Sequence, residues 1–516
     1  MKHAPILLAL TMVLGLLVPA VAYAQKTGPI RWTGTLYFNG SPVPGTELHG
    51  TTYLIPSGTQ VVVQPGARLL FGPNYMLVVE GELLVQGEKN APVYALALDK
   101  VRGWRGILIQ GSTSHAHLQY FIMEEFRGYA LRIADTHIVA HHIHLTSSYC
   151  MGLLYLKHAS GCIHDVNASA TLRGMGRVKL APDVTVRRAA IAVYLRRCHS
   201  VSLQNITVDV QGYPGCSVLG LLLFNSSNIH VVHSEVKVFA QVRVLPPPPR
   251  TPPGIPPRNA PTFSEGGSSS RLNPRPPSSR LRAVESYGFA ATTDCSNIHV
   301  EHSAFQAVGE GHATYVAAFY VTERSCHVYV DHVETYACSE GKGTACAFWV
   351  ENHAKHVYGE HLSLIARSSV SGTAIAIWVE TYVSKLHLAH VNATAIAGNG
   401  SLSHPNGGKA LGFVLRSSRD VQLVHVSIQA HGGDGVDGCA THPNGGSGGP
   451  AIGAMLECSE CSATHAVFAA YGGDGGDAYG ANGIPGDGGD ATALLLIESY
   501  LYGKYTTIEE DGVAGT

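Results

Sequence analysis

Two tryptophans, each followed two residues later by a glutamate, suggest chemistry first. Trp349 precedes Glu351, and Trp378 precedes Glu380 at the same spacing. Flat aromatic rings suit the apolar face of a sugar ring, and carboxylates at their edge accept hydrogen bonds from its hydroxyls. The same position in other segments holds two tyrosines, so the ligand-binding candidates also include Tyr194 and Tyr320. The favoured alternative is an apolar stripe covered by loops, by the Pro-rich insert or by a neighbouring subunit.

A second set of acidic residues recurs at a regular spacing in the middle of the chain. It consists of Glu301, Asp331 and Glu360. Stacked carboxylates of this kind can hold a cation or act as an acid and base pair in sugar chemistry. More often such a row is a solvated face.

Glycine-rich segments near the end of the sequence carry regularly spaced aspartates. Gly432 to Asp437 and Gly472 to Asp477 match half of the calcium-binding nonapeptide, and Pro485 to Asp490 nearly does. The candidate calcium ligands are Asp434, Asp437, Asp474, Asp477, Asp487 and Asp490. Because these copies are not tandem repeats of nine residues, flexible stacked loops with aspartates at their turns are the favoured alternative.

The elements that position these residues are predicted from a repeat marked by histidine. Successive histidines of the motif are 30, 29, 29, 35 and 40 residues apart, from His302 to His465. Before each of them, apolar residues alternate with polar ones, as in the pair Ile298 and Val300, which predicts β-strands. A repeat of this length with two or three short strands cannot bury its apolar face alone, so we expect the repeats to stack as a solenoid.

The segment from Ile55 to Ser112, which includes "VVVQPGARLLFGPNYMLVVEGELLVQG", resembles the opening of a right-handed parallel β-helix of the pectin-lyase-like superfamily. The motif "SNIHVEHSAF" is similar to the coil signature of that family. The resemblance implies an all-β fold of about a dozen coils, with long Gly-rich C-terminal loops. As a guide to function it is weak, since this fold hosts lyases, hydrolases, epimerases, adhesins and structural proteins.

In such coils the histidine position usually holds asparagine, whose side chains stack at a tight turn. The resemblance therefore implies a structural ladder, and an imidazole offers a similar donor and acceptor. Its expected members are His142, Asn205, His233, His302, His332, His361, His390, His425 and His465. A metal-binding ladder is disfavoured, because parallel rings about 4.8 Å apart do not converge on one ion.

The chain divides into three predicted regions. Residues 1–24 resemble an export signal with a cationic start, an apolar run and a small-residue cleavage site. Residues 25–100 are expected to form an N-terminal β cap and the first coils, and residues 101–516 the parallel β-helix. The helix is interrupted by a Pro/Ser/Arg-rich insert at 243–281, which is expected to be disordered.

The eleven cysteines show no complete zinc-binding set. Because export favours disulfides, Cys338 and Cys346 are the best candidate pair, whereas Cys461 is expected to be a small core residue. The formal net charge of −2 argues against a nucleic-acid partner, and no later segment is apolar enough to span a membrane.

These observations predict a secreted or cell-surface β-helix that acts as a binding or structural module. Its expected partners are carbohydrate or another cell-surface molecule, or copies of itself in a homo-oligomer. The alternative is a carbohydrate-active enzyme of the same fold, a polysaccharide lyase, hydrolase or epimerase. The segment "SYGFAATTD" begins like alginate-epimerase β-helices, but Ala-Ala-Thr-Thr replaces the expected Asp-Pro-His-Asp. No catalytic constellation is recognisable, so a non-enzymatic role is favoured, with calcium as a candidate cofactor.

Overall fold

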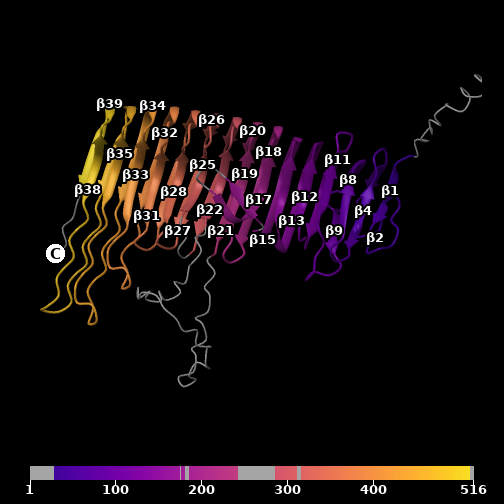
Figure 1. The fold of residues 1–516 in the computed structure, drawn as a ribbon, viewed down its shortest axis with the longest axis horizontal. Helices are drawn as coiled ribbons and strands as arrows, with labels where there is room; N and C mark the ends of the chain where they lie inside the picture. The colour runs from indigo at the N-terminus through magenta and orange to yellow at the C-terminus, as the bar shows by residue number, and fades with distance from the viewer. Residues whose placement is uncertain (1–27, 175, 180–184, 242–284, 311–314, 512–516) are drawn as a thin grey trace, which may run out of the picture.

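A computed structural model describes residues 28–174, 176–179, 185–241, 285–310 and 315–511. The predicted export signal and the predicted insert at 243–281 lie outside these ranges. The described residues contain β-strands and loops and no helix, and therefore no helix long and apolar enough to cross a membrane. The strands lie side by side along a rod, with β1 near one end and β38 to β40 at the other (Figure 1).

Three strand rows, here called walls 1, 2 and 3, run along this rod. Wall 1 is the sixteen-stranded sheet, in which β3 and β16 pair antiparallel and the other fourteen strands pair parallel, one from each coil. Its strands are β3 (Glu47–His49), β4 (Thr52–Ile55), β7 (Met76–Val79), β10 (Ile107–Gln110), β12 (Tyr129–Ala134), β14 (Gly152–Lys157), β16 (Gly176–Lys179), β17 (Thr185–Arg196), β19 (Ser217–Phe224), β22 (Glu285–Thr292), β25 (Tyr315–Val321), β28 (Thr344–Val350), β31 (Thr373–Val379), β33 (Lys409–Arg416), β35 (Ala451–Glu457) and β38 (Ala491–Ile497).

Walls 2 and 3 belong to one twenty-four-stranded sheet that bends between them. Wall 2 begins each strand pair and contains β1 (Ile30–Trp32), β5 (Gln60–Val63), β8 (Glu82–Gln86), β20 (Ser227–Val232), β23 (Ser296–Glu301), β26 (Cys326–Asp331), β29 (Lys355–Glu360), β36 (Glu460–Thr464) and β39 (Tyr500–Lys504). Wall 3 contains β2 (Thr35–Phe38), β6 (Arg68–Phe71), β9 (Val93–Ala97), β21 (Glu235–Ala240), β24 (Ala304–Gly309), β27 (Glu334–Ser339), β30 (Ser363–Ser368), β37 (Val467–Tyr471) and β40 (Thr507–Asp511). Six longer strands cross from wall 2 to wall 3, namely β11 (His115–Glu124), β13 (His137–Cys150), β15 (Ser160–Leu172), β18 (His199–Gly212), β32 (Ser384–Ile396) and β34 (Arg419–His431).

This arrangement is a parallel β-helix, which confirms the solenoid predicted from the repeat and the fold implied by the family resemblance. Each coil passes through walls 1, 2 and 3 in turn and pairs with the next coil in parallel, as β22, β23 and β24 do with β25, β26 and β27. Alternate apolar side chains point inward, and the core runs through the whole rod. Phe289, Phe319 and Phe348 stack in this interior with centroids 4.4 and 5.2 Å apart.

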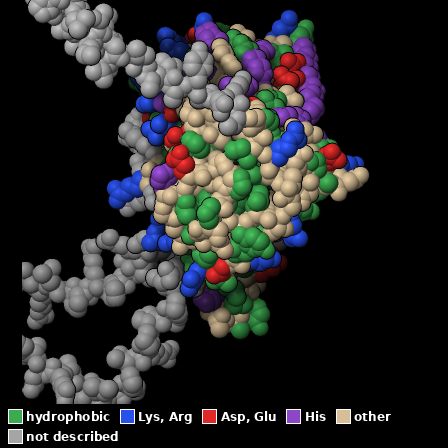
Figure 2. Space-filling model, turned by 90° about the vertical axis from the view of Figure 1, so that its right-hand side faces the viewer, with side chains coloured by type: hydrophobic (Ala, Val, Ile, Leu, Met, Phe, Trp, Pro, Cys, Tyr) green, Lys and Arg blue, Asp and Glu red, His purple; other side chains and the backbone are tan. Residues whose placement is uncertain are grey.

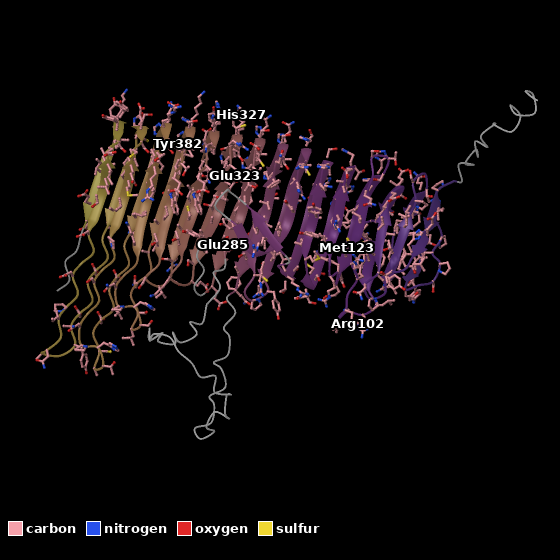
Figure 3. The ribbon with its side chains drawn as sticks, viewed as in Figure 1. Arg102, Met123, Glu285, Glu323, His327 and Tyr382 are labelled. Atoms are coloured by element: carbon pink, nitrogen blue, oxygen red, sulfur yellow. The ribbon has the colours of Figure 1, made fainter. Side chains whose placement is uncertain are left out.

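The three corners of a coil differ in how much chain they contain. From β11 onward, the corner between walls 2 and 3 is a short bend centred on one residue with positive φ, such as His302 at 47°. The corner between walls 1 and 2 contains two to four residues. The corner between walls 3 and 1 holds all the long loops, including the glycine-rich ones drawn at the lower left of Figure 1. In Figure 3, His327 and Tyr382 lie toward the upper edge of the rod, and Arg102, from a long loop, lies at the lower edge.

The cysteines correct one prediction. All eleven are free, including the expected partners Cys338 and Cys346. Cys338 lies in β27 on wall 3, whereas Cys346 lies in β28 on wall 1, where its Sγ donates to the Phe348 carbonyl. The prediction relied on the short turn between them, but the turn places the two thiols on different walls. Cys461 is buried in the core, as predicted.

Candidate functional site

The corner between walls 2 and 3 carries a continuous column of side chains. The parallel register places the expected ladder residues in one row, with Tyr120, Asp165 and Tyr505 as further members. All have φ between 45° and 56°, and most of their side chains are exposed. The left-handed backbone turns each side chain away from the core, and asparagine, aspartate and histidine are the side chains that tolerate this conformation best. Figure 2 shows histidines gathered along the upper right of the end view.

The imidazoles of this column stack on one another from coil to coil. Between His233 and His465, successive ring centroids are 4.4 to 5.1 Å apart, and Tyr505 continues the stack at 4.9 Å. At the other end, Asn205 Nδ2 donates to Asp165 Oδ1 at 2.6 Å, and Tyr120 stacks on His142 at 4.2 Å. The column therefore links adjacent coils on the outside of the rod.

The acidic row predicted beside this column lies at the end of wall 2. Glu301, Asp331 and Glu360 occupy one register position in three successive coils. Asp331 Oδ1 lies 2.9 Å from His332 Nδ1 and 3.1 Å from His361 Nδ1. Partial burial opposes ionisation of Asp331, but its hydrogen bonds with His361 and His332 hold its pKa below the ordinary value.

The aromatic row predicted on the outer face of wall 1 is present, but it is not an exposed platform. Tyr320 and Trp349 are buried, and Tyr194 and Trp378 are partly buried in a second apolar cluster outside the solenoid core. The two tryptophan rings stack with centroids 4.7 Å apart, so their facing surfaces are already in contact. Their Nε1 atoms are buried and have no hydrogen-bond partner. A role for these four residues in ligand binding remains a prediction.

Glu351 and Glu380 follow this row at the corner between walls 1 and 2. Glu351 is only 4% exposed, and its carboxylate accepts hydrogen bonds from Tyr320, from Thr322 at 3.4 Å and from Asn352 Nδ2 at 2.9 Å. Burial, aided by the neighbouring Glu380 carboxylate, raises the pKa of Glu351 to about 7. A carboxyl group with such a pKa can take up or release a proton near neutral pH.

The aspartates of the glycine-rich loops are engaged in loop packing. Asp434 Oδ1 accepts from the Asp474 N–H at 3.0 Å, and Asp437 Oδ1 accepts from the Asp477 N–H at 2.9 Å. Their spacing of three residues is the period of polyproline II. A Cβ on Gly449 would overlap the Gly408 carbonyl oxygen, so the loops need glycine to pack this closely. The two remaining candidates, Asp487 and Asp490, accept through their backbone carbonyls from neighbouring loop residues. Calcium binding by these six aspartates remains a prediction.

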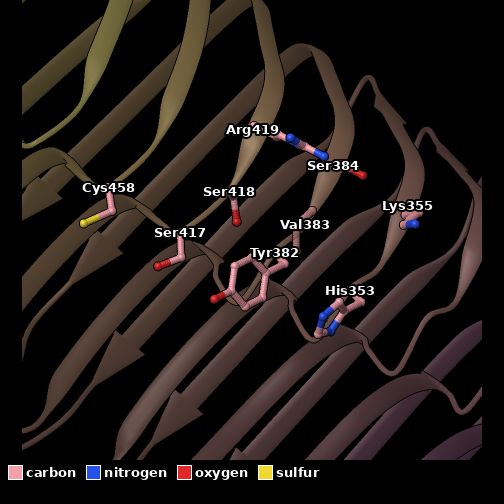
Figure 4. Close-up of a pocket in the computed structure, with 9 residues that line it drawn as sticks. All are labelled: His353, Lys355, Tyr382, Val383, Ser384, Ser417, Ser418, Arg419 and Cys458. Atoms are coloured by element: carbon pink, nitrogen blue, oxygen red, sulfur yellow. The ribbon is translucent and has the colours of Figure 1, made fainter.

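An open groove, which was not predicted from the sequence, lies on the corner between walls 1 and 2 (Figure 4). Its volume is about 700 Å³. Four of its lining residues have positive φ and lie at this corner in successive coils; they are His353, Tyr382, Ser417 and Cys458. The groove therefore runs along the rod axis over three coil spacings, ~14 Å.

A change in corner length forms this groove. Four residues join β31 to β32, whereas Ser417 and Ser418 alone join β33 to β34. The longer connection, which carries the exposed Tyr382 ring, 65% accessible, projects further from the rod than the shorter connection of the next coil. The difference leaves a recess beside Tyr382. Lys355 and Arg419 line the same groove, and neither forms an ion pair with another described residue.

A second pocket of about 530 Å³ adjoins the groove on wall 2. Its lining includes Tyr358, Lys385 and His387. Lys385 directly follows Ser384 of the first groove, and Asp420 directly follows Arg419, so the two hollows share strands β32 and β34. The sequence signal that could have revealed them is the shortening from "VETYVSK" to "LRSSRD" between equivalent strands.

No family model matches the chain, and no curated protein matches it in sequence. Among solved structures it is similar to the A-module of the Azotobacter vinelandii mannuronan C-5 epimerase AlgE4, with 10% identity, a TM-score of 0.19, and coverage of 87% of this chain and 91% of that one. An alginate lyase from Paenibacillus sp. str. FPU-7 shows 8% identity, a TM-score of 0.14, and coverage of 86% and 93%. With TM-scores this low, the assignment of the fold rests on the strand pairings.

Proposed function

We propose that this protein is an exported β-helix that binds a linear, acidic sugar chain in the groove at Tyr382. The observation that carries the proposal is the combination of an exposed tyrosine ring with two unpaired cations, Lys355 and Arg419, in one elongated groove. The ring offers an apolar surface to a pyranose, and the cations suit its carboxylates. The serine hydroxyls of the lining suit its hydroxyl groups.

Three points support an acidic ligand rather than a neutral one. None of the described residues that line the groove is acidic. Lys385 adds a third cation in the adjoining pocket, where Asp420 is the one acidic residue of the described lining. The formal net charge of the chain is only −2, so the protein as a whole repels an anionic sugar chain only weakly.

Binding of purified polysaccharides to the full-length mature chain tests the proposal. We expect uronate-containing chains to bind more tightly than neutral chains, and we expect added salt to weaken them. Tyr382→Ala and the double variant Lys355→Ala with Arg419→Ala should each lower the affinity on the order of tenfold. Tyr213→Ala removes another exposed tyrosine, 47% accessible, and is the matched control.

Two results would overturn this assignment. Equal binding of neutral and acidic chains would refute the acidic class of ligand. Unchanged binding by both groove variants would show that the groove is not the binding site. The export part of the proposal has its own test, since the mature protein should begin at Gln25 when its N-terminus is sequenced.

A second candidate function is cleavage or epimerisation of such a chain, and the raised pKa of Glu351 favours it. Glu351 and Glu380 lie two residues before His353 and Tyr382 of the groove, so the carboxyl pair and the groove share the same two turns. If the chain is an enzyme built on this pair, Glu351→Gln should abolish product formation and leave binding intact. Formation of new chain ends, or of epimerised residues, by the Glu351→Gln variant at the wild-type rate would exclude this candidate.

A further inference from the structure

The histidine corner brings three metal-ligating atoms together at Asp331. The carboxylate of Asp331, His332 and His361 each offer one ligand atom, and these atoms all lie within 4.8 Å of one another. The Asp331 oxygen lies between the two imidazoles, 2.9 Å from one Nδ1 and 3.1 Å from the other. Two parallel rings alone do not direct their nitrogens at one ion. The Asp331 oxygen adds a third ligand atom close to both Nδ1 atoms, so that one ion could contact all three.

The fold fixes this arrangement before any ion binds. His332 and His361 have φ of 50° and 52°, which directs both rings outward from the same corner. Their centroids are 4.4 Å apart because parallel coils stack at the strand spacing. Asp331 is the last residue of β26, one residue before His332. The strand register that aligns the two coils therefore also places Asp331 and His332 beside His361.

The donor set selects the class of ion. Two imidazoles and one carboxylate suit a borderline divalent ion such as Zn²⁺, whereas Ca²⁺ and Mg²⁺ prefer sites made of oxygen. A tetrahedral zinc ion with bonds of ~2.0 Å separates its ligand atoms by about 3.3 Å. The two distances at Asp331 are already close to this value.

We propose that Asp331, His332 and His361 bind one zinc-class divalent cation on the outside of the rod, with a fourth position open to water. Glu360, His361 and His390 form an overlapping group of the same kind. In that group the carboxylate lies 3.9 Å from His361 Nδ1, so its donors are less converged. His361 belongs to both groups and is the residue on which binding depends most.

Titration of the full-length mature chain with Zn²⁺ alone, in a buffer that does not bind metal, tests the proposal. We expect wild-type protein to bind one more equivalent of Zn²⁺ than His361→Ala does, with release of protons on binding. Asp331→Asn keeps the size of the side chain and should weaken this equivalent on the order of tenfold. His465→Ala is the matched control, because His465 stacks in the same column outside both groups.

The outcomes separate a built site from unspecific adsorption. Loss of zinc in His361→Ala and Asp331→Asn, with full binding in His465→Ala, supports the site, and Ca²⁺ should not compete. Equal loss in His465→Ala, or no difference between wild type and His361→Ala, overturns it. Circular dichroism on each variant shows whether the β-helix is intact. If His361→Ala is unfolded, Asp331→Asn and His332→Gln decide the question.

Discussion

Among the candidate residues, Glu351 has the environment most typical of a functional carboxyl group, because it is buried and its pKa is raised. It receives hydrogen bonds from a tyrosine, a threonine and an asparagine, yet it is held among aromatic side chains. Hydrogen bonds favour its charged form and burial disfavours it, and burial has the larger effect. The folded state therefore holds a proton that the unfolded state releases.

Glu351→Gln should change how stability depends on pH. The folded-state pKa of Glu351, about 7, lies above the value of 4.5 for a free glutamate. Its contribution to stability is therefore complete below pH 4.5 and is lost as pH rises through 7. We expect the wild-type free energy of unfolding to fall by about 3 kcal/mol over this range from this group, and the variant to lack this fall. Denaturant unfolding at pH 5 and pH 8 measures it; an identical fall in the variant would refute the assignment.

His299, on wall 2, should have the opposite effect on the pH dependence. Burial, with help from the neighbouring His230, lowers the pKa of His299. The stability that depends on its neutral form is present above the unfolded value of about 6.5 and is lost as pH falls below it. Tyr329 occupies the same register position in the next coil and stacks on His299 at 4.7 Å. His299→Tyr should therefore keep the stack, and its melting temperature should fall less than that of the wild type between pH 7.5 and pH 5.

At this scale the sequence allowed partial prediction. The spacing of Glu351 and Glu380 marked them as candidates because strand alternation determines which side chains share a face. A covered position for Trp349 was predicted as an alternative, but the second cluster that buries it was not, because that cluster is assembled from several coils. Tyr382 was missed for a similar reason, since its exposure follows from the corner length of the next coil rather than from its own neighbours in the sequence.

The corner between walls 2 and 3 shows how a single backbone conformation organises an element. From β11 onward, each coil turns there through one residue with positive φ, and the repeat of histidine identified most of these positions from sequence alone. What the repeat did not reveal was the partner of each ring. The approach of Asp331 to two imidazoles depends on which coils carry an acid before the histidine, and on the stacking distance between those coils.

A pair of substitutions at His302 tests the importance of this conformation. His302 has φ of 47° and lies outside the two metal-ligating groups. Asparagine tolerates this backbone, whereas the branched side chain of valine does not. We expect His302→Val to lower the free energy of unfolding by about 1–3 kcal/mol relative to His302→Asn. Chemical denaturation of both variants measures the difference, and equal stability would show that the corner adapts to either side chain.

The two ends of the molecule are unequal. At the N-terminal end, β1 and β2 each pair with only one other described strand, but their Trp32 and Phe38 side chains are buried. At the other end, β38, β39 and β40 pair with the preceding coil, and no other described strand pairs with them. Tyr500 and Ile508 are 69% and 50% exposed there. Repeat proteins need a polar capping repeat at such an end to remain soluble and to avoid pairing with one another.

The exposed side chains and unpaired edges of the last described coil, β38 to β40, should make the protein associate with itself. We expect the apparent mass in solution to rise with concentration, because unpaired strand edges and apolar side chains favour pairing. The double variant Leu496→Lys with Ile508→Lys should reduce this association, as measured by analytical ultracentrifugation. Ile365→Lys, in the middle of wall 3, is the control. A monomer at all concentrations in the wild type would contradict the prediction.

At the scale of the whole molecule, the repeat allowed a solenoid of stacked coils to be predicted, because each repeat is too short to bury its own apolar face. That the coils form a parallel β-helix was implied by the resemblance of Ile55 to Ser112 and of the histidine motif to a known family. The grooves and the unequal ends could not be predicted in this way. They arise where successive coils differ, and a repeat describes what the coils have in common.

The long loops all leave the rod at one corner, and this has a consequence for how the chain can change. The spacing between ladder histidines grows from 29 to 40 residues along the last coils, yet the strand pairing of walls 1 and 2 continues without a shift. Residues 242–284 also fall, in sequence, between a wall 3 strand and a wall 1 strand. New peptide sequence can thus be acquired along this one seam while the groove and the histidine column keep their register, so the rod can diversify on one side and stay constant on the other.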